Sequence, residues 1–249
     1  MKIKNLISFT LAILTINALA QAPKKNPEST EIWEPQPRIV VPGNTAGSAP
    51  SDALVLFDGK TFENWVSLDG GPVKWNLSDG AMTVVRGGKD IRTKQEFGDF
   101  QLHIEWRTPE VTNANQQVSQ NRGNSGIFLQ DRYEVQVLDS HENKTYANGQ
   151  AGSLYKQHIP LVNASRKPGE WQTYDIIYSA PRFSAEGRVL IPANVTVIHN
   201  GVLIQNHVDL WGPTEYIGLP MYQPHGKAPL RLQDHGDAVS YRNIWIREL

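Results

Sequence analysis

The chain has 249 residues, a length that suits one large all-β domain or two small domains. It is 39% hydrophobic and 20% charged, which is the composition of a globular protein and excludes a chain that is disordered throughout. The net charge of −1 with no cluster of Lys and Arg argues against a nucleic-acid partner, and the absence of Cys excludes a disulfide scaffold and a thiol nucleophile.

The first twenty residues have the three parts of an export signal. A positively charged MKIK precedes the apolar run LISFTLAILTI, and Ala18-Leu19-Ala20 is a small-residue cleavage site. We predict a signal peptide over 1–20, a mature start at Gln21 and a periplasmic or secreted protein. No later apolar run approaches the roughly 18 residues of a membrane span.

Residues 21–50 hold six of the 16 prolines and are predicted to form a linker or arm ahead of a domain over 51–249. Two interpretations of this segment stay open. Trp33 and residues 39–41 would pin part of it to the domain surface, or the segment is a disordered leader.

The domain itself reads as a series of short strands. In chain order we predict strands at 53–57, 73–77, 81–85, 90–93, 100–107, 126–130, 133–140, 171–178, 194–199, 202–207, 230–233 and 239–246. A single helical turn is predicted at 61–65. Asn200-Gly201 between two of the strands is a strong hairpin signal. Many strands separated by Gly, Pro and Asn turns predict an all-β sandwich or jelly roll.

Three of these strands carry reactive groups on one face. Side chains alternate along a strand, so Tyr133, Val135 and Val137 share an apolar face while Glu134 and Gln136 share the other. If the three strands are neighbours, they form one polar floor that would bind a sugar and transfer protons. The ordinary alternative is a solvated outer face. The residues concerned are His103, Glu105, Arg107, Glu134, Gln136, Arg231, Gln233 and His235.

Two further segments attract attention. Residues 140–170 lack a regular pattern, and a long irregular segment in a compact domain is typical of a site cover. The sequence Asp234-His235-Gly236-Asp237 contains metal-competent side chains, but a turn stabilised by Asp and Gly is the favoured interpretation. No complete ligand motif is present, so a divalent metal stays an option without a predicted site, and nothing in the sequence sets an oligomeric state.

Several separated motifs resemble one family. LFDGKTFENW, NSGIFLQDRYEVQVLDS, GSLY, EWQTYDI, the HNG hairpin and PLRLQDHGDAVSYRNIWIREL occur in the order found in the DUF1080 family, the 3-keto-disaccharide hydrolase domain. The resemblance covers residues 54–249. It implies a concanavalin-like jelly roll of two curved antiparallel sheets, and an exported hydrolase that acts on 3-keto-glycosides or 3-keto-disaccharides.

The resemblance also implies roles for residues. A base would remove the C2 proton, the group at C1 would leave, and water would add back. Glu134 or Glu105 would be the base, with Glu134 favoured because it lies in the YEVQ motif. Arg107 or a metal would stabilise the oxyanion, and His235 would supply a proton. Hydroxyl contacts would come from His103, Asn124, Gln136, Arg231 and Gln233, and the rim from Tyr155 and Lys156.

Two other functions fit the same residues. One is a non-catalytic, lectin-like carbohydrate-binding module, because a fold does not fix a function. The other is a conventional glycosidase that uses Glu105 and Glu134 as its pair of carboxylates.

Overall fold

The computed structural model describes residues 26–110 and 119–249, so the predicted signal peptide lies outside the described residues. Contacts divide the chain into two units, 1–39 and 40–249. The described part of the first unit contains one 3₁₀ turn, η1 (Pro27–Thr30), which the side chain of Asn26 caps. Trp33 is exposed and its indole N–H donates to the neighbouring Glu31. No helix in the described residues is long and apolar enough to cross a membrane.

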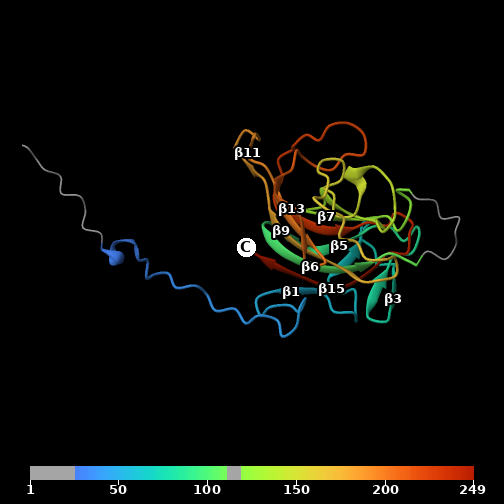
Figure 1. The fold of residues 1–249 in the computed structure, drawn as a ribbon, viewed down its shortest axis with the longest axis horizontal. Coiled ribbons are helices and arrows are strands. Elements are labelled where there is room, and N and C mark those ends of the chain that lie inside the picture. Colours follow the sequence, from blue (N-terminus) through green and yellow to red (C-terminus); the bar gives the residue numbers. More distant parts are fainter. Residues whose placement is uncertain (1–25, 111–118) are drawn as a thin grey trace, which may run out of the picture. The chain divides into compact units, whose positions relative to one another are not determined.

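The larger of two sheets in the second unit has eight strands (Figure 1). Seven of them follow the order β13-β12-β9-β6-β15-β4-β3, and β1 pairs with β15 off this path. Their bounds are β1 (Leu54–Phe57), β3 (Asn76–Ser78), β4 (Ala81–Thr83), β6 (Phe100–Arg107), β9 (Gln172–Ser179), β12 (Asn194–His199), β13 (Val202–Asp209) and β15 (Ser240–Glu248).

The smaller sheet has five strands in the order β2-β5-β14-β7-β8. Their bounds are β2 (Trp65–Ser67), β5 (Ile91–Phe97), β14 (Ala228–Leu232), β7 (Ser125–Leu129) and β8 (Tyr133–Val137). A separate hairpin joins β10 (Arg182–Phe183) to β11 (Val189–Ile191), and a 3₁₀ turn, η2 (Ala147–Gly149), lies in the irregular segment 140–170. All strand pairings are antiparallel, as the jelly-roll prediction required.

One hydrophobic core lies between the two sheets. Alternate residues of β6, including Leu102, Ile104 and Trp106, and of β8, including Val135 and Val137, are fully buried in it. The period of two in the sequence produces this arrangement, because every second side chain points to the same face of a strand. The intervening residues of β6 and β8 therefore point away from the core, on opposite outer faces of the sandwich.

Three buried tyrosine hydroxyls cross this core from the larger sheet to the smaller one. Tyr174 donates to the backbone carbonyl of Gln136 at 2.9 Å, Tyr178 to Gln130 at 2.7 Å, and Tyr241 to Ser125 at 2.7 Å. A buried hydroxyl without a partner is destabilising, so these bonds are strongly favoured. They fix the relative position of the sheets at β7 and β8.

Most of the predicted strands are present with shifted ends. The Asn200-Gly201 hairpin is confirmed, with φ of 52° and 82° at the two loop residues, as a two-residue hairpin turn requires. The predicted helical turn at 61–65 is wrong, because residues 63–64 form a turn that leads directly into β2.

Residues 40–53, which we name the strap, cover part of the outer face of the larger sheet. The carbonyl of Gly47 accepts hydrogen bonds from the side chains of Asn243 at 2.9 Å and Trp245 at 2.8 Å. Gly47 has φ of +78°, and an added Cβ would lie 3.0 Å from His103 Nε2. This close approach explains why a residue without a side chain occupies the position.

Candidate active site

A cleft of about 470 Å³ opens over β7 and β8, on the outer face of the smaller sheet. Strands and the turns after them supply the deeper residues, and the irregular segments supply the outer ones. The lining residues are Gln120, Asn121, Asn124, Phe128, Glu134, Gln136, Tyr146, Tyr155, Thr214, Tyr216, Gln233 and His235.

Glu134 lies on β8 and faces this cleft. Its side chain makes no hydrogen bond or ion pair with any described residue, although the residue is only 6% exposed. Burial raises the pKa of this carboxyl to about 8; the nearby Arg231 opposes the shift and Asp90 adds to it. A buried carboxylate without a partner is rare in a structural role, and a raised pKa is typical of a group that moves protons.

The hairpin that carries Glu134 is tightly built. The first two of its three loop residues, Gln130 and Asp131, have positive φ of 48° and 58°, and Arg231 forms an ion pair with Asp131. Gly126 pairs with Gln136 across the hairpin, and a Cβ added at Gly126 would overlap Glu134 Oε1. Glycine at this position therefore leaves the space that the carboxylate occupies.

Gln136 and Asn124 form a rigid amide pair beside Glu134. Gln136 Nε2 donates to Asn124 Oδ1 at 2.9 Å and to the backbone carbonyls of Ser125 and Val137. Asn124 Nδ2 donates in turn to the carbonyl of Gln120 at 2.7 Å. Both predicted residues line the cleft, and their donors are already engaged within the protein.

Gln233 and His235 enter the cleft from the segment after β14. The side-chain amide of Gln233 makes no hydrogen bond with a described residue, and its Oε1 is buried without a partner. His235 is exposed at the edge of the cleft. An amide that faces a cleft without a partner is suited to bind a polar substrate group.

The segment 234–237 is a turn, as the sequence favoured. Asp234 accepts hydrogen bonds from the backbone N–H groups of Lys89 and Gly236, and Asp237 accepts one from Asn124 at 2.8 Å. Within residues 26–110 and 119–249, no three His, Asp or Glu side chains are grouped to hold a metal ion. The two aspartates thus stabilise the loop that carries His235.

Arg231 does not line the cleft. Its guanidinium forms ion pairs with Asp90 and Asp131 and lies 3.6 Å from the ring centroid of Phe128. The prediction that it holds substrate hydroxyls places it wrongly, because its donors face these carboxylates. Arg231 instead supports Phe128, whose ring does line the cleft.

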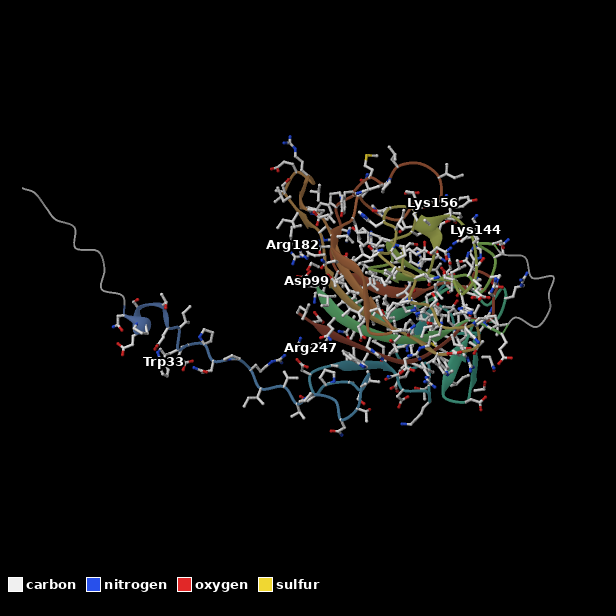
Figure 2. All side chains as sticks on the ribbon, in the orientation of Figure 1. Trp33, Asp99, Lys144, Lys156, Arg182 and Arg247 are labelled. Carbon is white, nitrogen blue, oxygen red and sulfur yellow. The ribbon has the colours of Figure 1, made fainter. Side chains whose placement is uncertain are left out.

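The mouth of the cleft is aromatic. Tyr155 lines it as predicted, together with Tyr146 and Tyr216, while Lys156 lies beside it over the ring of Tyr216. Lys156 and Arg247, which binds the strap through Asp52, lie on opposite sides of the domain (Figure 2). The predicted site residues did not include six that line the cleft: Gln120, Asn121, Phe128, Tyr146, Thr214 and Tyr216. The irregular segment 140–170 was a signal for Tyr146, whereas residues 211–221 showed no pattern that pointed to a site.

His103, Glu105 and Arg107 are not part of this cleft. They lie on β6 in the larger sheet, and Arg107 packs on Trp171. The expectation of one floor from three neighbouring strands is wrong for this strand, because the core separates the outer faces of β6 and β8.

The charges of His103 and Glu105 are paired with neighbouring groups. His103 Nδ1 lies 2.7 Å from Asp175, and Glu105 binds Arg242 and Asn243. Burial would lower the pKa of His103, but hydrogen bonds and charge interactions with Asp175 and Glu105 raise it to about 9. Burial would raise the pKa of Glu105, but bonds from His103, Asn243 and Arg242 hold it at about 2. These groups fit a structural role under the strap.

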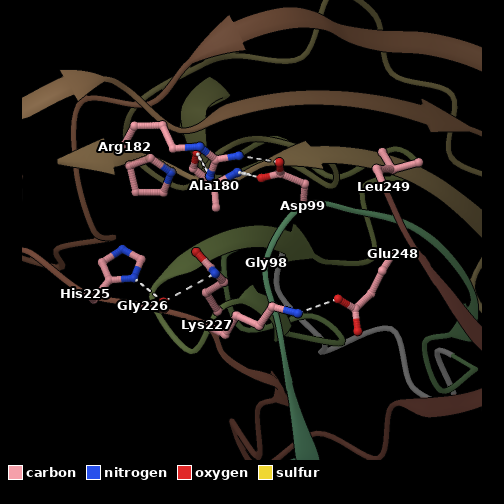
Figure 3. Close-up of a pocket in the computed structure, with 11 residues that line it drawn as sticks. Gly98, Asp99, Ala180, Arg182, His225, Gly226, Lys227, Glu248 and Leu249 are labelled. Carbon is pink, nitrogen blue, oxygen red and sulfur yellow. Dashed lines mark hydrogen bonds and ion pairs between the residues drawn. The ribbon is translucent and has the colours of Figure 1, made fainter.

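A second cavity of about 300 Å³ lies near the C-terminus (Figure 3). Its charges are paired, Asp99 with Arg182 and Lys227 with Glu248. His225 in the same cavity is bonded to the hydroxyl of Tyr133 at 2.7 Å. Both side-chain carboxylates that line this cavity are therefore paired, unlike that of Glu134.

The chain is similar to a known protein family and to a named relative. Residues 52–247 match the family model described as a 3-keto-alpha-glucoside-1,2-lyase-like domain. A 3-keto-disaccharide hydrolase of Bacteroides thetaiotaomicron is 27% identical over 240 residues, 80% of each chain.

Two solved structures from Parabacteroides distasonis, both provisionally described as glycosyl hydrolases, share the fold. One is 55% identical with a TM-score of 0.84 and covers 90% of this chain and 97% of its own. The other is 21% identical with a TM-score of 0.60 and covers 80% and 94%. The chain belongs to the family of the 3-keto-alpha-glucoside-1,2-lyase-like domain and is an enzyme of the 3-keto-disaccharide hydrolase type.

Proposed function

We propose that this enzyme cleaves 3-keto-glucosides by removing the C2 proton, eliminating the group at C1 and adding water, with Glu134 as the base. One observation carries the proposal. Glu134 is a buried carboxylate with a raised pKa, it has no partner among the described residues, and it faces a cleft. Among the described residues that line the cleft, it is the only carboxylate.

The chemistry is set by the ketone. A carbonyl at C3 acidifies the proton on C2, and Glu134 takes that proton while the electron pair forms an enolate with its charge on O3. The enolate expels the oxygen at C1, which takes a proton as it leaves. Water then adds to C1 of the resulting enone, and Glu134 returns the proton to C2. The products are a 3-keto-sugar and the free leaving group.

Two other cleft residues suit the remaining roles. Gln233 has an amide without a partner among the described residues, so its N–H groups are available to stabilise charge on O3. His235 lies at the exposed edge, where it would supply a proton to the leaving oxygen and regain one from solvent. This role for His235 is the one expected from the sequence. Arg107 lies on β6 in the larger sheet and does not line the cleft, so we assign it no part in stabilising the oxyanion.

The conventional glycosidase alternative is not supported by the geometry. A pair of catalytic carboxylates lies within roughly 10 Å, on either side of the glycosidic bond. Glu105 and Glu134 lie on opposite faces of the sandwich, and Glu105 is bound to Arg242. The lectin-like alternative predicts sugar binding without turnover, which the same assays detect.

The test is Glu134→Gln, measured with a 3-keto-α-glucoside by release of its leaving group. We expect the fold to be retained and kcat to fall by about 10²–10⁴-fold, the usual contribution of a general base. Circular dichroism and thermal unfolding report whether the variant is folded.

Glu105→Gln is the matched control. It makes the same change on the opposite face, where we expect kcat to stay within about twofold while stability falls, because Arg242 and His103 lose a carboxylate partner. Full turnover by Glu134→Gln, or inactivity of folded Glu105→Gln, would reject the assignment.

We also propose that the protein is exported, on the strength of the charged, apolar and small-residue regions in residues 1–20. N-terminal sequencing of protein recovered outside the cytoplasm should begin at Gln21. Retention of Met1 in the mature protein would contradict export by this route.

A further inference from the structure

The cleft changes in chemistry from its base to its mouth. Glu134 is 6% and Gln136 is 1% exposed, so the polar base is deep. Tyr146 is 40% and Tyr216 is 70% exposed, so the tyrosines lie at the mouth. A glycosyl ring whose C2 contacts Glu134 must lie at the base, and its leaving group then extends toward the mouth.

Hydrogen bonds and a cation–π contact hold the aromatic mouth of the cleft in place. Thr214 N donates to the carbonyl of Arg132 at 2.9 Å, and its Oγ1 accepts from the N–H of Glu134 at 2.9 Å. Lys156 Nζ donates to the carbonyl of Tyr216 and lies 4.2 Å from the centroid of its ring. The segment that carries Tyr216 is therefore attached at the same residue as the base, so the ring has a defined position relative to the chemistry.

Tyr146 and Tyr155 pack against each other on the wall of the cleft. Tyr146 and Tyr155 bond to each other through their hydroxyls at 2.8 Å, with the rings 6.2 Å apart at an angle of 63°. The two hydroxyl groups are thus bonded to each other, and Lys156 Nζ lies 5.6 Å from the centroid of the Tyr155 ring. A leaving group that contacts this wall meets mainly aromatic carbon, and the mutual hydrogen bond uses part of the bonding capacity of the two hydroxyls.

Apolar side chains continue outward from Tyr216. Ile217, Leu219 and Met221 are 82%, 87% and 72% exposed. Because these residues follow Tyr216 in the chain, they add exposed apolar surface to the segment that carries it. Of the polar residues at the mouth, Gln120 is engaged by Gly149 and Thr145, and Asn121 is exposed.

We propose that the mouth is a leaving-group subsite for aromatic aglycones, formed by Tyr146, Tyr155 and Tyr216, so that the enzyme prefers aryl 3-keto-glucosides over 3-keto-disaccharides. This inference rests on the proposed function for the reaction itself. Stacking on the tyrosine rings supplies the preference, because offset or edge-to-face aromatic pairs are favourable beyond the area that they bury.

Binding tests the subsite without turnover. The probes are 4-nitrophenyl α-glucoside and maltose, which lack the 3-keto group, titrated by calorimetry into the full chain. We expect tighter binding of the aryl glucoside, and Tyr216→Ala should weaken it about tenfold while it changes the affinity for maltose by less than about threefold. Tyr216→Phe keeps the ring and should retain the affinity within about twofold.

Turnover separates this inference from the proposed function. With 4-nitrophenyl 3-keto-α-glucoside and 3-keto-maltose, we expect Tyr216→Ala to raise KM for the aryl substrate alone and to leave kcat unchanged. Equal binding of both probes by the wild type, or an equal loss for both in Tyr216→Ala, would overturn the aromatic subsite. Aryl binding that depends on Tyr216 without turnover of either keto substrate would support the subsite and reject the proposed reaction.

Discussion

Gly126 shows how closely the Glu134 carboxylate, the proposed base, is fitted into the sheet. The position faces Gln136 across the β7–β8 hairpin, and an added Cβ would overlap Glu134 Oε1 and lie 2.8 Å from the ring of Phe128. No backbone strain is involved, because Gly126 does not have a positive φ. The structure therefore requires glycine here to leave space for the Glu134 carboxylate and the Phe128 ring.

Gly126→Ala should therefore reduce activity by moving the Glu134 carboxylate. We expect kcat/KM to fall about 10–100-fold, because a displacement of about 1 Å in a reacting group has effects of this size. Gly98→Ala is the control, since a Cβ there meets only Lys227 at an ordinary distance of 3.5 Å. Unchanged kinetics for folded Gly126→Ala would show that Glu134 is free to move or does not act.

Sequence patterns correctly predicted which face of a strand each side chain occupies, but they did not predict which distant residues it contacts. Alternation along 133–137 correctly placed Glu134 and Gln136 on a face away from the core. Alternation along 100–107 is equally correct, but nothing local states which sheet a strand joins. Glu105 and Arg231 carry reactive groups that distant partners neutralise, Arg242 in one case and Asp90 with Asp131 in the other.

Among the elements, the strap explains the outer face of the larger sheet. Gly47 bonds to Asn243 and Trp245, and its backbone lies against His103. The predicted catalytic group on β6 is thus a partly buried set of paired charges, of which His103 lies beneath the strap. In the sequence, β6 shows the same pattern as β8, a strand with one polar face, so the pattern alone does not distinguish paired structural charges from a functional site.

Gly47→Ala tests this arrangement when it is compared with Gly70→Ala. Both glycines have positive φ, +78° and +83°, so both variants should lose about 1 kcal/mol from backbone strain. Only Gly47 has a neighbour in the way, His103 at 3.0 Å, whereas Gly70 has open space.

Chemical denaturation should show that the free energy of unfolding falls by about 1 kcal/mol more in Gly47→Ala than in Gly70→Ala. Turnover by the folded protein should be unchanged. Equal losses for the two variants would mean that the strap yields freely at this contact.

The strands were easier to predict than their partners. Turn residues such as Asn200-Gly201 mark hairpins because the turn requires φ above zero. The β14–β7 and β6–β15 pairs join segments about a hundred or more residues apart, and no local pattern specifies such pairings. Gln233 and His235 reach the cleft because β14 pairs with β7. Since the sequence does not specify such pairings, the residues that line the cleft were only partly predicted.

For the whole molecule, stability and activity should have different pH optima. Burial raises the pKa of Glu134 from 4.5 to about 8, so its stabilising protonated form is lost as pH rises through that value. The raised pKa of His103, about 9 against 6.5, acts in the same direction above neutrality. Burial lowers the pKa of His199 to about 4, so its contribution is lost as pH falls below 6.5.

The expected stability maximum therefore lies at about pH 5–6.5, with the melting temperature falling toward pH 9. In the proposed reaction Glu134 acts as a base only when it is deprotonated, so kcat/KM should rise with pH up to about 8. Scanning calorimetry and initial rates over pH 4–9 measure both curves. In Glu134→Gln the decline in melting temperature between pH 5 and 8 should become shallower, and an unchanged decline would assign it to other groups.

The attachment of the segment that carries Tyr216 has an evolutionary consequence. Thr214 ties the start of the segment to β8 through hydrogen bonds with backbone groups, which depend little on the side chains beyond it, while residues 217–221 extend outward and are largely exposed. Substitutions, or a transplanted loop, beyond Thr214 can therefore change which leaving groups are accepted without altering Glu134 or the sandwich. Exchange of this short stretch is thus a route to a new leaving-group preference that keeps the proposed base in place.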